Sequence, residues 1–139
     1  MVYVTYAVPN VGFGGVVDVF QENGTFVKTL IHNTSLLNQA WGIALAPSNF
    51  GPLSNTLLVS NNSVQGTING FNPVTGKYVG TVTDQHGTKI ILNNLWGIAF
   101  GGGSPNNGAT NQLFVTVGQG IGTSELAGTF ASIVFNPVP

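Results

Sequence analysis

Residues 40–46 read Ala-Trp-Gly-Ile-Ala-Leu-Ala, and residues 95–101 read Leu-Trp-Gly-Ile-Ala-Phe-Gly. The motif Trp-Gly-Ile-Ala at residues 41–44 therefore returns at residues 96–99, after 55 positions. Self-similarity at a fixed spacing is typical of architectures built from one repeated structural unit. The chain is accordingly expected to repeat such a unit, with a Trp-Gly segment at the same place in each.

Other segments repeat at nearly the same spacing. Two apolar residues, a valine and a hydroxyl residue occur at 2–5, 57–60 and 113–116, and Phe-Asn-Pro-Val occurs at 71–74 and 135–138. Valine, threonine and phenylalanine favour half-buried strands, whereas glycine, asparagine and proline mark turns. No segment shows the apolar spacing of an amphipathic helix. The chain is therefore predicted to be all-β.

Four segment types recur in one order, and each is expected to form a strand. The ten expected strands span residues 2–7, 15–20, 26–31, 41–46, 57–62, 66–71, 77–83, 96–100, 113–118 and 130–135. Four short antiparallel strands every 40–55 residues are typical of a β-propeller blade. The prediction is one propeller-like domain over residues 1–139, with blade units at about 1–36, 37–92 and 93–139. The alternative is a sandwich or barrel of ten short strands.

The same segments resemble a known family. The resemblance rests on residues 2–7, 15–20, 38–47, 49–52, 66–71, 75–77, 95–101 and 128–130. They look like a family of uncharacterised secreted bacterial proteins with a six-bladed, NHL-like propeller, often found with exosortase-type sorting signals. The resemblance implies that the chain corresponds to the C-terminal portion of longer, secreted members. It implies no activity, because the family has none to carry over.

The expected strands do not complete a ring. Ten strands make about two and a half blades, whereas closed propellers have about four to eight. Unpaired strand edges favour pairing with another chain. Two copies with three blades each would form a six-bladed ring, so a homodimer or higher homo-oligomer is expected. The alternatives are an aggregation-prone fragment and open head-to-tail stacking.

The composition excludes several function classes. The chain has 3 lysines, 4 acidic residues, no arginine and no cysteine, which argues against nucleic-acid binding, phosphate chemistry and thiolate sites. No apolar run reaches the roughly 18 residues of a membrane helix, and no signal peptide is visible. Glycine-rich residues 101–103 and 118–122 lack the context of phosphate loops. The neutral, amide-rich composition favours a secreted or cell-surface location and self-association.

Groups suited to acid–base catalysis are few. Asp84 and His86 share one turn, and His32 follows the corresponding strand of the first unit. Asp84 could orient His86 for catalysis, or both could belong to a hydrogen-bonded surface turn. Asp18 is expected to face solvent from a strand. No spacing fits a known metal site, so neither metal nor cofactor is expected.

The best candidates for a ligand site are the repeated tryptophans. Trp41 and Trp96 follow amides that include Asn38 and Asn94, and Asn61 ends another strand. An indole face can stack on a sugar while amides bind its hydroxyls. The alternative is that the tryptophans pack between units as structural anchors. Asn61 could also hold Ca²⁺ through its oxygen, although calcium sites usually need several carboxylates.

Three functions remain open on the sequence. The first is a non-enzymatic extracellular propeller module for binding or self-assembly, with a carbohydrate or small molecule as ligand. The second is a propeller enzyme of lactonase, esterase or lyase type, working in a central channel. The third is a structural subunit of a filament or matrix that assembles through edge strands. Because propellers support many functions, the fold alone does not choose among them.

Overall fold

The computed structural model describes residues 1–8, 14–32, 34–118 and 128–136. All ten expected strands are present, each within two residues of its expected ends, so the all-β prediction is confirmed. The strands are β1 Val2–Ala7, β2 Gly15–Phe20, β3 Phe26–His32, β4 Ala40–Leu45, β5 Leu57–Asn61, β6 Ile68–Phe71, β7 Tyr78–Thr81, β8 Leu95–Phe100, β9 Gln112–Val117 and β10 Thr129–Val134. One short 3-10 turn, η1, spans Gly51–Leu53.

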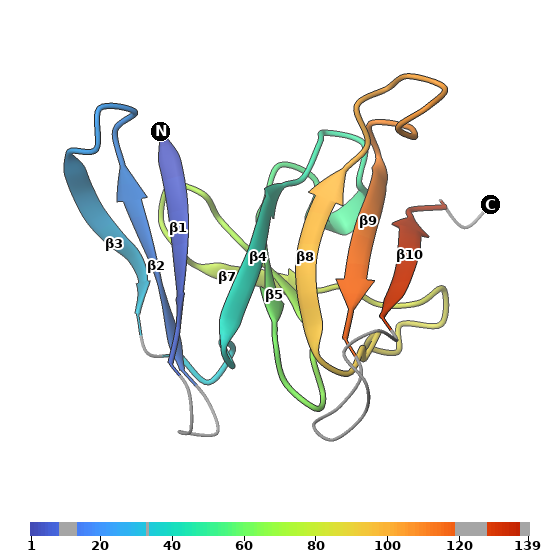
Figure 1. Cartoon of the computed structure of the whole chain (residues 1–139), viewed down its shortest axis with the longest axis horizontal. Helices are drawn as coiled ribbons and strands as arrows, with labels where there is room; N and C mark the ends of the chain where they lie inside the picture. The colour runs from blue at the N-terminus through green and yellow to red at the C-terminus, as the bar shows by residue number, and fades with distance from the viewer. Residues whose placement is uncertain (9–13, 33, 119–127, 137–139) are drawn as a thin grey trace.

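The strands form three antiparallel sheets that follow one another along the chain. The first sheet has the order β1-β2-β3, the second β4-β5-β6-β7 and the third β8-β9-β10. Figure 1 shows the three sheets side by side in chain order, with β4 between β1 and β8. Within the described ranges, no helix has the length and apolar character that crossing a membrane requires.

The second sheet is covered on both faces, and this makes β5 the centre of the molecule. All five residues of β5 are buried. Leu57 and Val59 belong to the core shared with the first sheet, whereas Leu58 belongs to the core shared with the third. Successive strand side chains point to opposite faces. A strand between two other sheets therefore needs apolar residues at consecutive positions, which explains the sequence Leu-Leu-Val.

A hydroxyl group at one repeated position links each sheet to the next. Ser60 Oγ accepts the N–H of Gly42 at 2.7 Å within its own sheet and donates to the carbonyl of Trp96 in the third sheet, also at 2.7 Å. Thr5 occupies the corresponding place in β1 and donates to the carbonyl of Trp41 in the second sheet at 2.5 Å. Thr5 and Ser60, the fourth residues of the two repeated segments, thus each form a hydrogen bond to the next sheet.

The glycine of the Trp-Gly motif is explained by the same contact. A Cβ atom on Gly42 would lie 2.7 Å from the carbonyl oxygen of Trp96 and 2.8 Å from the nitrogen of Ile98. Both are backbone atoms of β8, so the clash could be relieved only by separating the sheets. Glycine at this position lets β4 and β8 approach each other closely.

Candidate functional site

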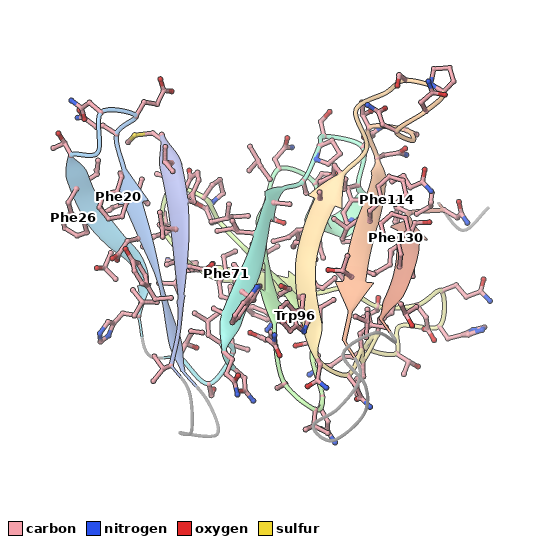
Figure 2. All side chains as sticks on the ribbon, viewed as in Figure 1. Phe20, Phe26, Phe71, Trp96, Phe114 and Phe130 are labelled. Atoms are coloured by element: carbon pink, nitrogen blue, oxygen red, sulfur yellow. The ribbon has the colours of Figure 1, made fainter. Side chains whose placement is uncertain are left out.

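Trp41 and Trp96 meet at the junction of the second and third sheets. They lie on the neighbouring strands β4 and β8, with ring centroids 5.3 Å apart and ring planes inclined by 51°. The two side chains are 46% and 47% exposed, and Figure 2 shows Trp96 near the start of β8. The structure therefore brings the two tryptophans together as a contact between sheets and leaves about half of each available to a ligand.

The amides before each tryptophan lie in a repeated backbone turn. Gln39 and Asn94 both adopt a left-handed conformation, with φ of 52° and 51°. Their carbonyls accept the N–H groups of Asn62 and Gly118 at 3.0 and 2.9 Å. Asn94 is half-buried, as is Asn38 beside the first turn. Asn94 thus lies in this turn and Asn38 next to it, in each case shortly before a tryptophan strand.

Asn61 is buried, and its side chain forms hydrogen bonds with the backbone of the segment that joins β3 to β4. It is 4% exposed, and its Oδ1 accepts the N–H of Asn38 at 2.9 Å. Its Nδ2 donates to the carbonyl of Leu36 at 3.0 Å and to the hydroxyl of Thr67 at 3.2 Å. Because oxygen and nitrogen already have partners in the protein, Asn61 offers no free group to a sugar or a calcium ion.

Asp84 and His86 share a turn, but the carboxylate binds the backbone rather than the imidazole. Asp84 Oδ1 accepts the N–H of Thr88 at 2.9 Å and the N–H of His86 at 2.8 Å. These two donors hold the pKa of Asp84 below its ordinary value of 3.8. The ring of exposed His86 lies 3.2 Å from the amide of Gln85. This geometry describes a surface turn and does not orient His86 as a general base.

An open groove of about 930 Å³ lies between that turn and the third sheet. Its lining includes Asp84 and His86 as well as the apolar residues Phe50, Leu53, Ile90 and Ile133. The groove borders β10 and β7, the outer strands of two neighbouring sheets. It therefore combines an apolar wall with one polar turn.

The remaining ionisable candidates lie elsewhere on the first sheet. His32 is exposed at the end of β3. Asp18 lies in β2 on the face opposite Val17, and its buried Oδ1 has no hydrogen-bond partner among the residues that the structure describes. Across residues 1–8, 14–32, 34–118 and 128–136, no three groups of metal-ligating type lie close enough to hold an ion.

One surface was missed in the sequence, namely the face of the third sheet that points away from the second. Phe114 and Phe130 stack there, with centroids 5.3 Å apart and planes inclined by only 9°, as Figure 2 shows. Phe130 pairs with Thr116 as Ile68 pairs with Ser60 and Val17 with Thr5. Yet Phe130 is 70% exposed, whereas Val17 and Ile68 are 0% and 2% exposed.

The repeat contains an indication of this exposed surface, because Phe130 occupies a position that recurs in the other two sheets. Strand register identifies Phe130 as the third member of a series whose other members are buried between sheets. Two expectations lie outside the described residues, namely most of the glycine-rich segment 118–122 and the end of the second Phe-Asn-Pro-Val segment.

Comparison with known proteins finds relatives in a giant virus. The chain is 36% identical over 110 residues to an uncharacterised protein of Acanthamoeba polyphaga mimivirus, covering 79% of this chain and 25% of that protein. A second uncharacterised mimivirus protein is 34% identical over 94 residues, covering 68% and 24% of the two chains. A third is 31% identical over 84 residues, covering 60% and 15%. No family model and no solved structure matches the chain.

These relatives correct one expectation. The resemblance to secreted bacterial NHL-like proteins with exosortase-type signals was wrong, because the similar proteins are viral and no family model supports it. The shared motifs consist of strand and turn residues, which repeated β-sheets require whatever their origin. The chain spans about a quarter or less of the length of these relatives.

Proposed function

We propose that this chain is a non-enzymatic module of propeller type that works by binding and self-assembly. The observation that carries the proposal is the pair of stacked phenylalanines on the outer face of the third sheet. Phe130 is 70% exposed there and stacks on Phe114, although its register equivalents in the other two sheets are buried. An exposed aromatic patch of this kind marks an interaction surface.

The repeated contact between sheets supports the description of the sheets as blades. The first sheet meets the second, and the second meets the third, through hydroxyl-to-carbonyl bonds at equivalent positions, Thr5 to Trp41 and Ser60 to Trp96. A propeller consists of sheets that pack in this repeated way around an axis. Three such sheets form part of a ring, and further blades would complete it.

A second copy of the chain is the partner that best fits this surface. The outer face of its first sheet carries Tyr6 and Val4, of which Tyr6 is 44% exposed. Packing the third sheet of each copy on the first sheet of the other would make a six-bladed ring with two-fold symmetry. The same contact without closure would give a filament, which is the structural-subunit alternative. An extracellular or cell-surface location remains a prediction.

The experiment is the solution mass of the chain and of two matched variants, measured by light scattering with size exclusion. Phe130→Ser removes the exposed ring of the third sheet. Val74→Ser changes a residue that is 71% exposed in the β6–β7 turn, away from that face. We expect a dimer for the wild type and for Val74→Ser, and a monomer for Phe130→Ser. A wild type that is monomeric at about 0.1 mM, well above the Kd of a stable dimer, would remove the proposal.

A second candidate function is carbohydrate binding by the paired tryptophans. It is favoured because Trp41 and Trp96 lie 5.3 Å apart and are each about half exposed, so that two indole faces are offered to one ligand. We expect a neutral oligosaccharide to change the tryptophan fluorescence saturably, and Trp41→Ala to weaken binding by about tenfold. A screen of neutral sugars that leaves the fluorescence unchanged up to about 10 mM, above the Kd of even weak binding, would exclude this function.

The enzyme alternative has less support. Asp84 is occupied by two backbone N–H groups, and His86 is exposed beside it. A lactonase, esterase or lyase needs a positioned acid or base whose pKa suits the reaction. The lowered pKa of Asp84 makes it a weaker base than an ordinary aspartate.

A further inference from the structure

Among the described residues, the first sheet has no strand that corresponds to β4 of the second sheet or β8 of the third. In the second sheet β4 pairs with β5, and in the third sheet β8 pairs with β9. The corresponding edge of β1 has no paired strand in the described part of the chain, because the order of that sheet is β1-β2-β3. A free edge exposes backbone N–H and C=O groups that can bind another strand.

The hydroxyl group of Thr5 marks where that missing strand would lie. In the other sheets the equivalent oxygen accepts the N–H of the motif glycine, at 2.7 Å for Ser60 and Gly42 and at 2.9 Å for Thr116 and Gly97. Thr5 uses its hydroxyl proton to donate to the carbonyl of Trp41. Among the described residues no N–H donates to its oxygen, so this acceptor is open towards the free edge.

We infer that the free edge of β1 is a strand-addition site that binds an extended Trp-Gly-Ile-Ala segment from outside these 139 residues. The register of β4 on β5 places Ile43 opposite Val59 and Ala44 opposite Leu58. The same register on β1 places the isoleucine of the added segment opposite Val4 and its alanine opposite Tyr3. The glycine N–H of the segment then donates to Thr5. Main-chain pairing of this kind is a common mode of peptide recognition.

Selectivity for glycine follows from the geometry of the existing strands. A Cβ atom on Gly42 would lie 2.7 Å from the Trp96 carbonyl and 2.8 Å from Ser60 Oγ. At the β1 edge the equivalent atoms are the carbonyl of Trp41 and the hydroxyl oxygen of Thr5. A segment with alanine in place of this glycine would meet the same obstruction, so the site distinguishes Trp-Gly from Trp-Ala.

The occupant is a strand from outside these 139 residues rather than a Trp-Gly strand of a second copy. Both Trp-Gly strands of this chain, β4 and β8, are already paired with β5 and β9. A second copy could supply one of them only by unfolding a sheet of its own. Proteins of similar sequence extend well beyond the matched region, which makes up 25% and 24% of two mimivirus relatives. This site does not depend on the third-sheet face that carries the proposed self-assembly.

The test is the binding of a dye-labelled peptide with the sequence of residues 94–101, flanked by lysines for solubility and followed by fluorescence anisotropy. We expect saturable binding of one peptide per chain. A peptide with alanine in place of the glycine that follows its tryptophan should bind about tenfold more weakly, because of the steric obstruction. The Thr5→Val protein should bind the glycine peptide about fivefold more weakly, because one hydrogen bond is lost. The matched Thr116→Val protein should bind like the wild type.

Three results would overturn the inference: no binding up to the solubility limit of the peptide, equal binding of the two peptides, or equal binding by the wild-type and Thr5→Val proteins. Amide hydrogen exchange on the wild type gives a second readout if Thr5→Val does not fold. The peptide should slow exchange in residues 2–7, and unchanged exchange there would reject the site. The solution mass tests self-assembly through the third sheet, and peptide binding tests strand addition at β1. Because the two measurements concern different surfaces, either proposal can be rejected without the other.

Discussion

At the scale of single residues, identical amino acids in the repeat have different surroundings. Gly42 and Gly97 occupy the same place in the Trp-Gly motif. A Cβ on Gly42 would lie 2.7 Å from a backbone oxygen of the next sheet, whereas a Cβ on Gly97 would have its nearest neighbour, Thr116 Oγ1, at 3.4 Å. Substituting alanine at each of the two glycines therefore separates two contributions to the free energy of unfolding. One is the steric clash between closely packed sheets, and the other is the change from glycine to alanine itself.

We predict that Gly42→Ala destabilises the chain and that Gly97→Ala does not. A side chain forced against backbone atoms costs about 1–3 kcal/mol, whereas an unobstructed surface change stays within about 0.5 kcal/mol. Urea unfolding of the two variants measures both free energies. An equal loss of stability in the two would show that the close approach of β4 to β8 is not what requires glycine.

At the scale of elements, the turns are held by side chains that bind their own backbone. The turn between β7 and β8 depends on Asp84, whose Oδ1 accepts the N–H groups of His86 and Thr88. The β6–β7 turn uses Asn72 in the same way, because its Oδ1 accepts the N–H groups of Val74 and Thr75. Aspartate and asparagine are favoured in turns for this reason. These contacts are local in the sequence and explain why the turns could be predicted.

The Asp84 turn should respond to acid. The two N–H donors hold the pKa of Asp84 below 3.8, so the ionised carboxylate favours the folded turn. This contribution is present above the ordinary pKa and is lost as the pH falls through the lowered pKa of the folded state. An NMR titration should show the amide resonances of His86 and Thr88 shifting with a midpoint below 3.8. A midpoint at or above that value would mean that the two bonds do not persist in solution.

At the scale of the whole molecule, apolar packing between sheets dominates over charge. The chain has seven charged residues, counted as 3 basic and 4 acidic, and a net charge of −1. Its two cores instead join the first sheet to the second and the second to the third. Any association through the third sheet should likewise depend on apolar contact around Phe114 and Phe130.

Self-association is therefore predicted to resist sodium chloride and to strengthen in sodium sulfate. Salt screens charges over a distance of about 10 Å at 0.1 M, but sulfate strengthens apolar burial. Light scattering from about 0.05 M to about 1 M sodium chloride, and then in sulfate, measures the mass under each condition. Dissociation on adding sodium chloride would assign the contact to charged groups instead.

The sequence by itself determined the strands, their order and the repeat. Alternation of apolar residues and the chemistry of turns act over a few neighbouring positions, so ten strands could be predicted within two residues of their ends. It also identified Trp41 and Trp96 as equivalent. The resemblance based on short motifs pointed to the wrong relatives, because strand and turn motifs of this kind occur in repeated sheets of any origin.

Only the tertiary structure decided which faces are covered. Ile68 and Phe130 hold the same place in the repeat, yet one is 2% exposed and the other 70%. In the described part of the chain, a further sheet packs on the second sheet but not on the third. Asn61 was a candidate ligand residue until the fold brought Leu36 and Asn38 within hydrogen-bond distance of its amide. Burial and pairing of this kind depend on segments tens of residues apart, and a local pattern carries no information about them.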